Sequence, residues 1–334
     1  MNRLVAVGLA AVLGIAGMTG CSQRDPLTVG TPSPASPAAA PSPTATPAGD
    51  TWPVPGATSA GDRHAEGIAV SGDRLAVGVD DPPQLAIMDA HSGRPLRVVD
   101  LPSAPSHVVA LPDGGFRVAA GRELVTVPKR GKESRVTWSG KSHDLAILPH
   151  GATAVGFPEK GTIGVYGEDG GLLRTIHTRG RPDGIAAVGD RIGVVDGAAT
   201  SLTVYRASTG KAEESLRAGN GALHVVATAN GRFVVADTRD GELLVFSTGP
   251  LYLRQRYPLH GSPYGMAYDA ERNVVWVTLT ARNEVVGFDL SGGAPKEVAR
   301  HPTVQQPDSV AVDPASGTVF VAGKAAGVVE AIPS

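Results

Sequence analysis

The stretch Ser106-His107-Val108-Val109-Ala110 decides the fold of this chain, because six variants of it occur elsewhere in the sequence. Most copies start with a polar residue, and all continue with mainly apolar residues that include an alanine. The seven copies begin at Glu66, Ser106, His143, Asp183, Leu223, Tyr264 and Asp308, at intervals of 37 to 44 residues. A repeat of this length is typical of propellers and solenoids, in which every repeat is one small structural unit.

Three further short segments follow each copy and have the character of β-strands. In the first repeat they are residues 74–79, 85–89 and 94–101, which are rich in β-branched residues and bounded by turn formers. Turn sequences such as Asn230-Gly231 fall where hairpins need them. Beyond the N-terminal region no segment keeps an apolar period of 3.6 residues. The sequence therefore predicts an all-β fold, a seven-bladed β-propeller of four-stranded antiparallel blades.

The seventh repeat ends after its third strand, so a closed ring needs one strand from elsewhere. The extended segment Thr51-Trp52-Pro53-Val54-Pro55 lies shortly before the first repeat. Its prolines are compatible only with an edge position, which the outermost strand of a blade provides. We expect this segment to pair with the last blade. The alternative is that it belongs to a loose linker and that the last blade has three strands.

The N-terminal residues have the features of a targeting segment. Arg3 supplies a positive charge, and residues 4–18 are apolar but too few to cross a membrane comfortably. The sequence Met18-Thr19-Gly20-Cys21 resembles the lipobox of bacterial lipoproteins. This resemblance implies that Cys21 is acylated and anchors the protein to the extracytoplasmic face of the cell membrane. An ordinary secreted protein with a chance cysteine is the alternative.

Composition then divides the chain into three parts. Between residues 31 and 48, 6 of 18 residues are Pro, and the remainder are Ala, Ser and Thr, so this stretch cannot bury a core. We expect a signal peptide at 1–20, a disordered lipid-anchored linker at 21–50 and the propeller at 51–334. The single cysteine excludes disulfides within the chain and thiolate metal sites. A net charge of −2, with scattered Arg and Lys, argues against nucleic acid as a partner, and we expect a monomer.

Residues 86–114 resemble the YVTN repeat of YncE-like propellers. A strand ends in Asp89, a Ser92-Gly93 turn and an outer strand follow, and Pro105 leads into the next inner strand. Weaker copies occur at 204–230 and 287–313, although the Tyr-Val-Thr-Asn sequence itself is missing. Surface-layer proteins, lactonase-like enzymes and binding proteins carry similar repeats. The resemblance therefore implies a shape more firmly than an activity.

In a propeller, the first residues of the innermost strands surround the mouth of the central channel. The polar residues at these positions are His64, Glu66, His107, His143, Asp183, His224, Tyr264 and Asp308. We take them as the candidate binding residues. Imidazoles and carboxylates at one mouth suit a divalent metal such as zinc, copper or nickel. The alternative, which we prefer, is a polar mouth filled with water, because His107 and His224 occupy the second position of the repeat and His143 the first.

Two short sequences at the mouth, Glu66-Gly67 and Pro182-Asp183-Gly184, resemble calcium-binding gluconolactonase propellers. That resemblance implies a calcium site with oxygen ligands, although the matching Asn is missing. No nucleophile elbow, phosphate-binding loop or zinc-protease motif occurs. We therefore expect no catalytic residues and no cofactor, and a binding or protein-interaction module for an envelope protein or a small ligand. The alternative is a lactonase-like or other metal-dependent hydrolase that uses the channel mouth.

Overall fold

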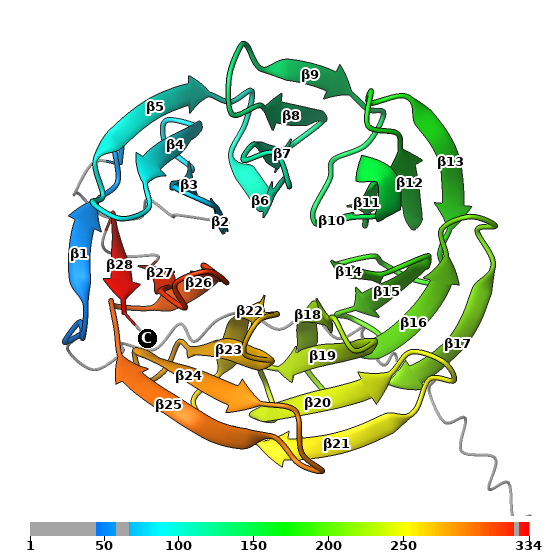
Figure 1. Ribbon diagram of the computed structural model, residues 1–334. Coiled ribbons are helices and arrows are strands. Elements are labelled where there is room, and N and C mark those ends of the chain that lie inside the picture. The colour runs from blue at the N-terminus through cyan, green and yellow to red at the C-terminus, as the bar shows by residue number, and fades with distance from the viewer. Residues whose placement is uncertain (1–44, 58–66, 324–326, 334) are drawn as a thin grey trace, which may run out of the picture. The chain divides into compact units, whose positions relative to one another are not determined.

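The computed structural model describes residues 45–57, 67–323 and 327–333. In these ranges the chain forms seven four-stranded antiparallel sheets, and the sheets follow one another round a ring in chain order (Figure 1). This confirms the predicted seven-bladed β-propeller. None of the described segments forms a helix with the length and hydropathy of a membrane span. Cys21, His64 and Glu66 lie outside the described residues.

The strands of each blade follow one another from the innermost to the outermost. Blades 1 and 2 are β2 (Ile68–Ser71), β3 (Arg74–Val79), β4 (Gln84–Asp89), β5 (Pro95–Asp100) and β6 (Pro105–Ala110), β7 (Phe116–Ala120), β8 (Glu123–Val127), β9 (Ser134–Thr137). Blades 3 and 4 are β10 (Leu145–Ile147), β11 (Thr153–Phe157), β12 (Thr162–Tyr166), β13 (Leu172–His177) and β14 (Gly184–Val188), β15 (Arg191–Asp196), β16 (Ser201–Arg206), β17 (Ala212–Arg217). Blades 5 and 6 are β18 (Ala222–Thr228), β19 (Arg232–Asp237), β20 (Glu242–Ser247), β21 (Leu253–Pro258) and β22 (Pro263–Asp269), β23 (Val274–Leu279), β24 (Glu284–Asp289), β25 (Lys296–Pro302). Blade 7 is β26 (Pro307–Val312), β27 (Val319–Gly323), β28 (Val328–Ile332), β1 (Asp50–Pro53), and a single 3-10 turn, η1 (Pro149–Gly151), follows β10.

Within a blade, the second and third strands are buried on both faces and the fourth faces solvent. All six residues of β3 are buried, whereas most of β5 is exposed. Aspartates that follow strands form the hairpin turns. For example, Oδ1 of Asp89 accepts hydrogen bonds from the backbone amides of His91 and Ser92, at 3.1 and 3.0 Å. The Ser-Gly and Asn-Gly turns of the sequence therefore lie between antiparallel neighbours.

The hydrophobic core consists of layers between neighbouring blades. Between blades 7 and 1, Phe320 packs in one cluster with Leu75 and Val77, and six similar clusters fill the other spaces. Close approach requires glycine at some positions. A Cβ atom on Gly193 would lie 2.7 Å from the ring of Phe233 in the next blade. Each blade is thus stabilised mainly by its two neighbours, so the ring must close to bury every layer.

The ring is closed by the segment that precedes the first repeat. Strand β1 pairs with β28, with Asp50 opposite Ala331 and Pro53 opposite Val328, and becomes the outermost strand of blade 7. The predicted pairing of residues 51–55 with the last blade is thereby confirmed, although the strand starts one residue earlier and ends at Pro53. The carboxylate of Glu330, fully buried, accepts hydrogen bonds from the amides of Gly49 and Val304, at 2.8 and 3.0 Å. It therefore ties β1 to the connection between blades 6 and 7.

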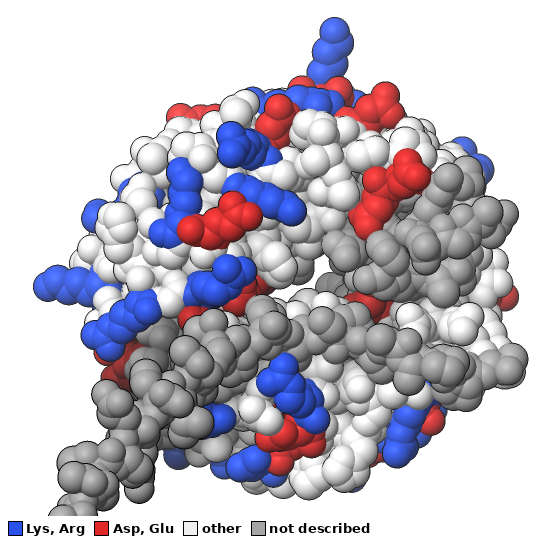
Figure 2. All heavy atoms as spheres, turned by 180° about the vertical axis from the view of Figure 1, so that it is seen from behind, with Lys and Arg blue, Asp and Glu red and all other residues white. Residues whose placement is uncertain are grey.

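Arginine side chains link neighbouring blades at the end of the ring opposite the repeat starts. The buried guanidinium of Arg117 in blade 2 donates to the carbonyl oxygens of Gly151 and Glu168 in blade 3, at 2.6 and 3.1 Å. Arg232 of blade 5 donates to the carbonyl oxygen of Leu290 in blade 6, at 2.8 Å. Elsewhere Lys and Arg lie among Asp and Glu, and Figure 2 shows this mixture around the opening of the ring.

Candidate functional site

The starts of the innermost strands lie together at one end of the ring, and their local geometry explains where the polar side chains of the repeat lie. Strands β6, β18, β22 and β26 each contain a shift of register after their first residues. In β6, Pro105 pairs with Ala120 but His107 pairs with Ala119, so one residue is extra on the inner strand. A bulge of this kind changes the direction of the side chains beside it. Simple alternation along the strand therefore does not decide which residues converge.

Contacts between these residues run from one blade to the next around the mouth. The imidazole of His107 reaches Asp144, and that of His143 reaches the backbone of Asp183. In the same direction around the ring, the side chain of His224 in blade 5 lies edge-on against that of Tyr264 in blade 6, with their ring centroids 4.3 Å apart. Each side chain thus contacts the repeat start of the following blade. The sequence placed these groups at one mouth, and the structure shows which pairs touch.

Asp144 orients the first of these imidazoles. Nδ1 of His107 lies 3.2 Å from Oδ1 of Asp144, and the side chains are 39% and 11% exposed. The same carboxylate accepts hydrogen bonds from the amides of Leu145 and Ile185, both at 2.7 Å, so its position is fixed by the backbone of two blades. Two lone pairs at 3.2 Å would repel, so Nδ1 carries a proton and Nε2 of neutral His107 has a free lone pair.

The second imidazole is fixed by a backbone carbonyl group. Nδ1 of His143 donates to the carbonyl oxygen of Asp183 at 2.7 Å, while the residue itself is exposed. A carbonyl oxygen can only accept, so Nδ1 carries the proton and Nε2 is again the acceptor of the neutral ring. Asp183 is buried, with its carboxylate 3.2 Å from Nη2 of Arg181 and 3.0 Å from the amide of Gly197.

The third imidazole is the least solvated. The Nε2 atom of His224 is shielded from solvent and makes no hydrogen bond in the described structure. Burial lowers the pKa of His224 to about 4, an effect that Asp144 opposes and that His143 and His107 reinforce. The three imidazoles and Asp144 therefore lie close enough to influence one another's charge, and His224 is neutral near pH 7.

The described part of the mouth does not form a compact metal site. Across residues 45–57, 67–323 and 327–333, the one group of three or more possible ligands within 4.8 Å of one another is Asp237, Asp240 and Glu242. That group already has partners, because Asp237 accepts the amide of Asn220 at 2.8 Å and Glu242 pairs with Arg256 at 2.7 Å. Asp308, another predicted mouth residue, is buried at the start of β26. The predicted contributions of His64 and Glu66 stay untested.

Two contributors to the mouth were not selected from the sequence. Asp144 stands beside His143 in the third repeat, in the second position of the repeat. Arg181 lies in a connection that has no regular secondary structure. The adjacent His143 and Asp144 in the third repeat were the one feature of the sequence that could have indicated the role of Asp144. Trp138 and Trp276 are buried and pack in the hydrophobic clusters between blades.

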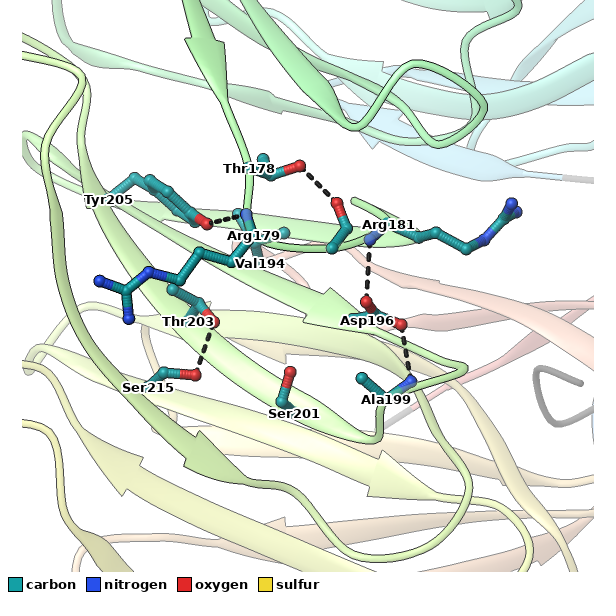
Figure 3. A pocket seen from close by; sticks show the side chains of 11 residues that line it. Thr178, Arg179, Arg181, Val194, Asp196, Ala199, Ser201, Thr203, Tyr205 and Ser215 are labelled. Atoms are coloured by element: carbon teal, nitrogen blue, oxygen red, sulfur yellow. Dashed lines mark hydrogen bonds between the residues drawn. The ribbon is translucent and has the colours of Figure 1, made fainter. Parts of the chain in front are cut away.

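A second cavity, of about 70 Å³, lies beside blade 4 (Figure 3). Three of its hydroxyl groups have partners: Oη of Tyr205 accepts the amide of Arg179 at 2.9 Å, and Thr203 and Ser215 bond to each other at 2.8 Å. A space of this size holds a few water molecules. It therefore contributes polar packing under the connection that carries Arg181, and the mouth remains the candidate site.

Comparisons with known proteins agree on the fold. No family model matches the sequence, and no curated protein matches it. A solved structure of hydrazine synthase from Kuenenia stuttgartiensis is similar, with a TM-score of 0.71 and 17% identity, over 84% of this chain and 99% of that one. Virginiamycin B lyase from Staphylococcus aureus has a TM-score of 0.71 and 13% identity, over 85% and 98%. A chain of a mitotic checkpoint complex has a TM-score of 0.73 and 12% identity, over 100% and 99%. At such identities the similarity shows the propeller fold alone.

Proposed function

We propose that this chain is a lipid-anchored propeller of the bacterial cell envelope that binds a ligand or partner protein at the channel mouth. The observation that carries the proposal is the state of the mouth imidazoles. Nε2 of His224 is buried without a hydrogen bond, and a buried polar atom in this state costs about 1–3 kcal/mol. His107 and His143 have their Nδ1 atoms engaged. A ligand would supply the missing partners.

The surroundings of the mouth support a binding role. The carboxylate of Asp144 is held by backbone amides from blades 3 and 4, so the groups that it orients are fixed before a ligand arrives. Binding sites with polar groups held in place by the fold lose less entropy on association. The resemblance of residues 18–21 to a lipobox adds the expected location outside the cytoplasm. Envelope location and lipid attachment are parts of the proposal.

The test is capture of an envelope partner by the full lipidated chain and by a variant that carries His107→Gln and His143→Gln. We expect the variant to lose the specific partner while it keeps its thermal stability, since both side chains are at least partly exposed. The matched control is Leu173→Ser at the opposite end of the blades, in an apolar cavity of about 520 Å³ that Leu148 and Val165 also line. Loss of the partner only in the Leu173 variant would place the working surface there and overturn the proposal.

A second candidate function, a lactonase-like or other metal-dependent hydrolase, is favoured by one observation. The contact between His107 and Asp144 resembles the way in which a carboxylate orients a general base or a metal-binding imidazole. Metal analysis of the protein purified from cells, together with hydrolysis of a model lactone, separates the two functions. A stoichiometric cation and an activity that His107→Gln abolishes would replace the binding proposal by the enzymatic one.

A further inference from the structure

The chemical class of the ligand follows from the protonation of the mouth imidazoles, and this inference rests on the proposed binding function. His143 must use the Nδ1-H tautomer, because its partner is a carbonyl oxygen at 2.7 Å. His107 must do the same beside the carboxylate of Asp144 at 3.2 Å. In both neutral rings the remaining nitrogen, Nε2, is an acceptor. These two partly solvated imidazoles therefore offer lone pairs and no N–H group to a ligand in the mouth.

The local charge has the sign that complements a donor. Asp144 carries a negative charge, and its described partners are two backbone amides and His107, with no Lys or Arg within ion-pair distance in the described chain. The second mouth carboxylate, Asp183, is balanced by Arg181. His224 is neutral at pH 7, because burial lowers its pKa to about 4. The Nε2 acceptors beside the carboxylate of Asp144 favour a cationic donor over an anion.

The spacing of the possible ligand atoms at the mouth favours an organic molecule over a single metal ion. Within the described residues, the possible ligand atoms of these side chains form no group of three within 4.8 Å. One metal ion needs its ligands at about 2.0–2.2 Å, and so close to one another. An organic donor reaches separate acceptors through hydrogen bonds of about 2.9 Å. The ring of Tyr264, edge-on to His224, adds an aromatic surface of the kind that ammonium groups favour.

We propose that the channel mouth binds the primary ammonium group of an amine ligand, with Nε2 of His107 and Nε2 of His143 as acceptors and Asp144 as the balancing charge. The ammonium donates hydrogen bonds to the two ring nitrogens and transfers no proton to them. The charged groups beside them are Asp144, which precedes β10, and Asp183 and Arg181 in the connection to β14. The neutral ring of His224 lies in β18.

The experiment follows the imidazole nitrogens of the full chain by isotope-labelled histidine NMR, with assignments from single His→Gln variants. We expect Nδ1-H tautomers for His107 and His143 near neutral pH. The diamine putrescine should then shift their Nε2 resonances, while succinate, of similar length but opposite charge, should not. His107→Gln or His143→Gln should weaken putrescine binding about tenfold, the effect of one hydrogen bond to a charged group. The control His177→Gln, on the exposed outer strand β13, should leave it unchanged.

Each other outcome overturns a defined part of the inference. Nε2-H tautomers, or succinate binding in place of putrescine, would show that the mouth is a site for acceptors, which removes the ammonium proposal but leaves the binding function. Stoichiometric zinc binding that shifts the same Nε2 resonances would replace the amine by a metal. If no probe shifts these resonances and the mouth variants still capture the native envelope partner, the ammonium proposal and the mouth as the working site are both refuted.

Discussion

The buried imidazole of His224 makes the stability of the propeller depend on pH in a predictable direction. Burial lowers the pKa of His224 from 6.5 to about 4, with Asp144 opposing the shift and His143 and His107 reinforcing it. Between these values the unfolded chain binds a proton that the folded protein does not. Stability from this residue is therefore fully present above about pH 6.5 and is lost as the pH falls toward about 4.

The size of this stability change follows from the difference between the two pKa values of His224. At about 1.4 kcal/mol per pH unit, a pKa change from 6.5 to about 4 corresponds to at most about 3 kcal/mol of unfolding free energy. Solvent at the exposed edge of the ring reduces this figure. In His224→Gln the side chain cannot titrate, so the variant should lose less stability than the natural protein when the pH falls from 7 to about 4.5.

The assay is urea unfolding of the natural protein and the variant at several pH values, with His177→Gln as the exposed control. We expect the difference in unfolding free energy between the natural protein and His224→Gln to shrink by about 2 kcal/mol over this range. The control should follow the natural protein. Parallel pH profiles for the natural protein and His224→Gln would refute the argument that burial holds this imidazole neutral.

Three further predictions concern attachment, closure and the links between blades. Cys21→Ser should release the protein from the membrane fraction without changing its melting temperature, and sedimentation of the variant with membranes after a high-salt wash would contradict the lipid anchor. Deletion of residues 21–58 should lower the melting temperature by several degrees more than deletion of 21–44, because only the longer deletion removes β1; equal melting temperatures would disprove the closing role of this strand. Arg117→Met should cost about 2–4 kcal/mol of unfolding free energy by leaving the carbonyl oxygens of Gly151 and Glu168 without a donor, whereas the exposed control Arg174→Met should cost little. Similar denaturant midpoints for the two arginine variants would show that the link is dispensable.

The repeat made the fold predictable because strand pairing within a blade is local. Asn230-Gly231 connects β18 to β19, and the pattern of the fifth repeat places both strands in register without distant information. The closing strand was predictable for a different reason. A fourth strand was missing from the last blade, and Trp52 lay in a spare extended segment just before the ring. In the structure its ring is 6.1 Å from that of Phe320.

The contacts between blades were beyond the reach of the sequence. His107 and Asp144 are 37 residues apart and meet only because β6 contains a bulge and blade 3 packs beside blade 2. The links of Arg117 likewise depend on carbonyl groups of another blade, which no side-chain pattern reveals. Residue types thus identified the end of the ring at which polar groups gather. Pairing, tautomers and the lowered pKa of His224 depend on distances of a few ångströms.

The direction of β1 has a consequence for a protein attached by its N-terminal segment. β28 runs away from the mouth, and β1 is antiparallel to it, so Gly49 and Asp50 lie beside Ala331 at the end remote from the histidines. A chain anchored through Cys21 would enter the ring from that far end. The mouth would then lie at the end of the ring opposite the point where the tether joins it, and any pull on the tether would load the hydrogen bonds between β1 and β28 before those of other strands. The strand that completes blade 7 would thus also act as the mechanical coupling between anchor and ring.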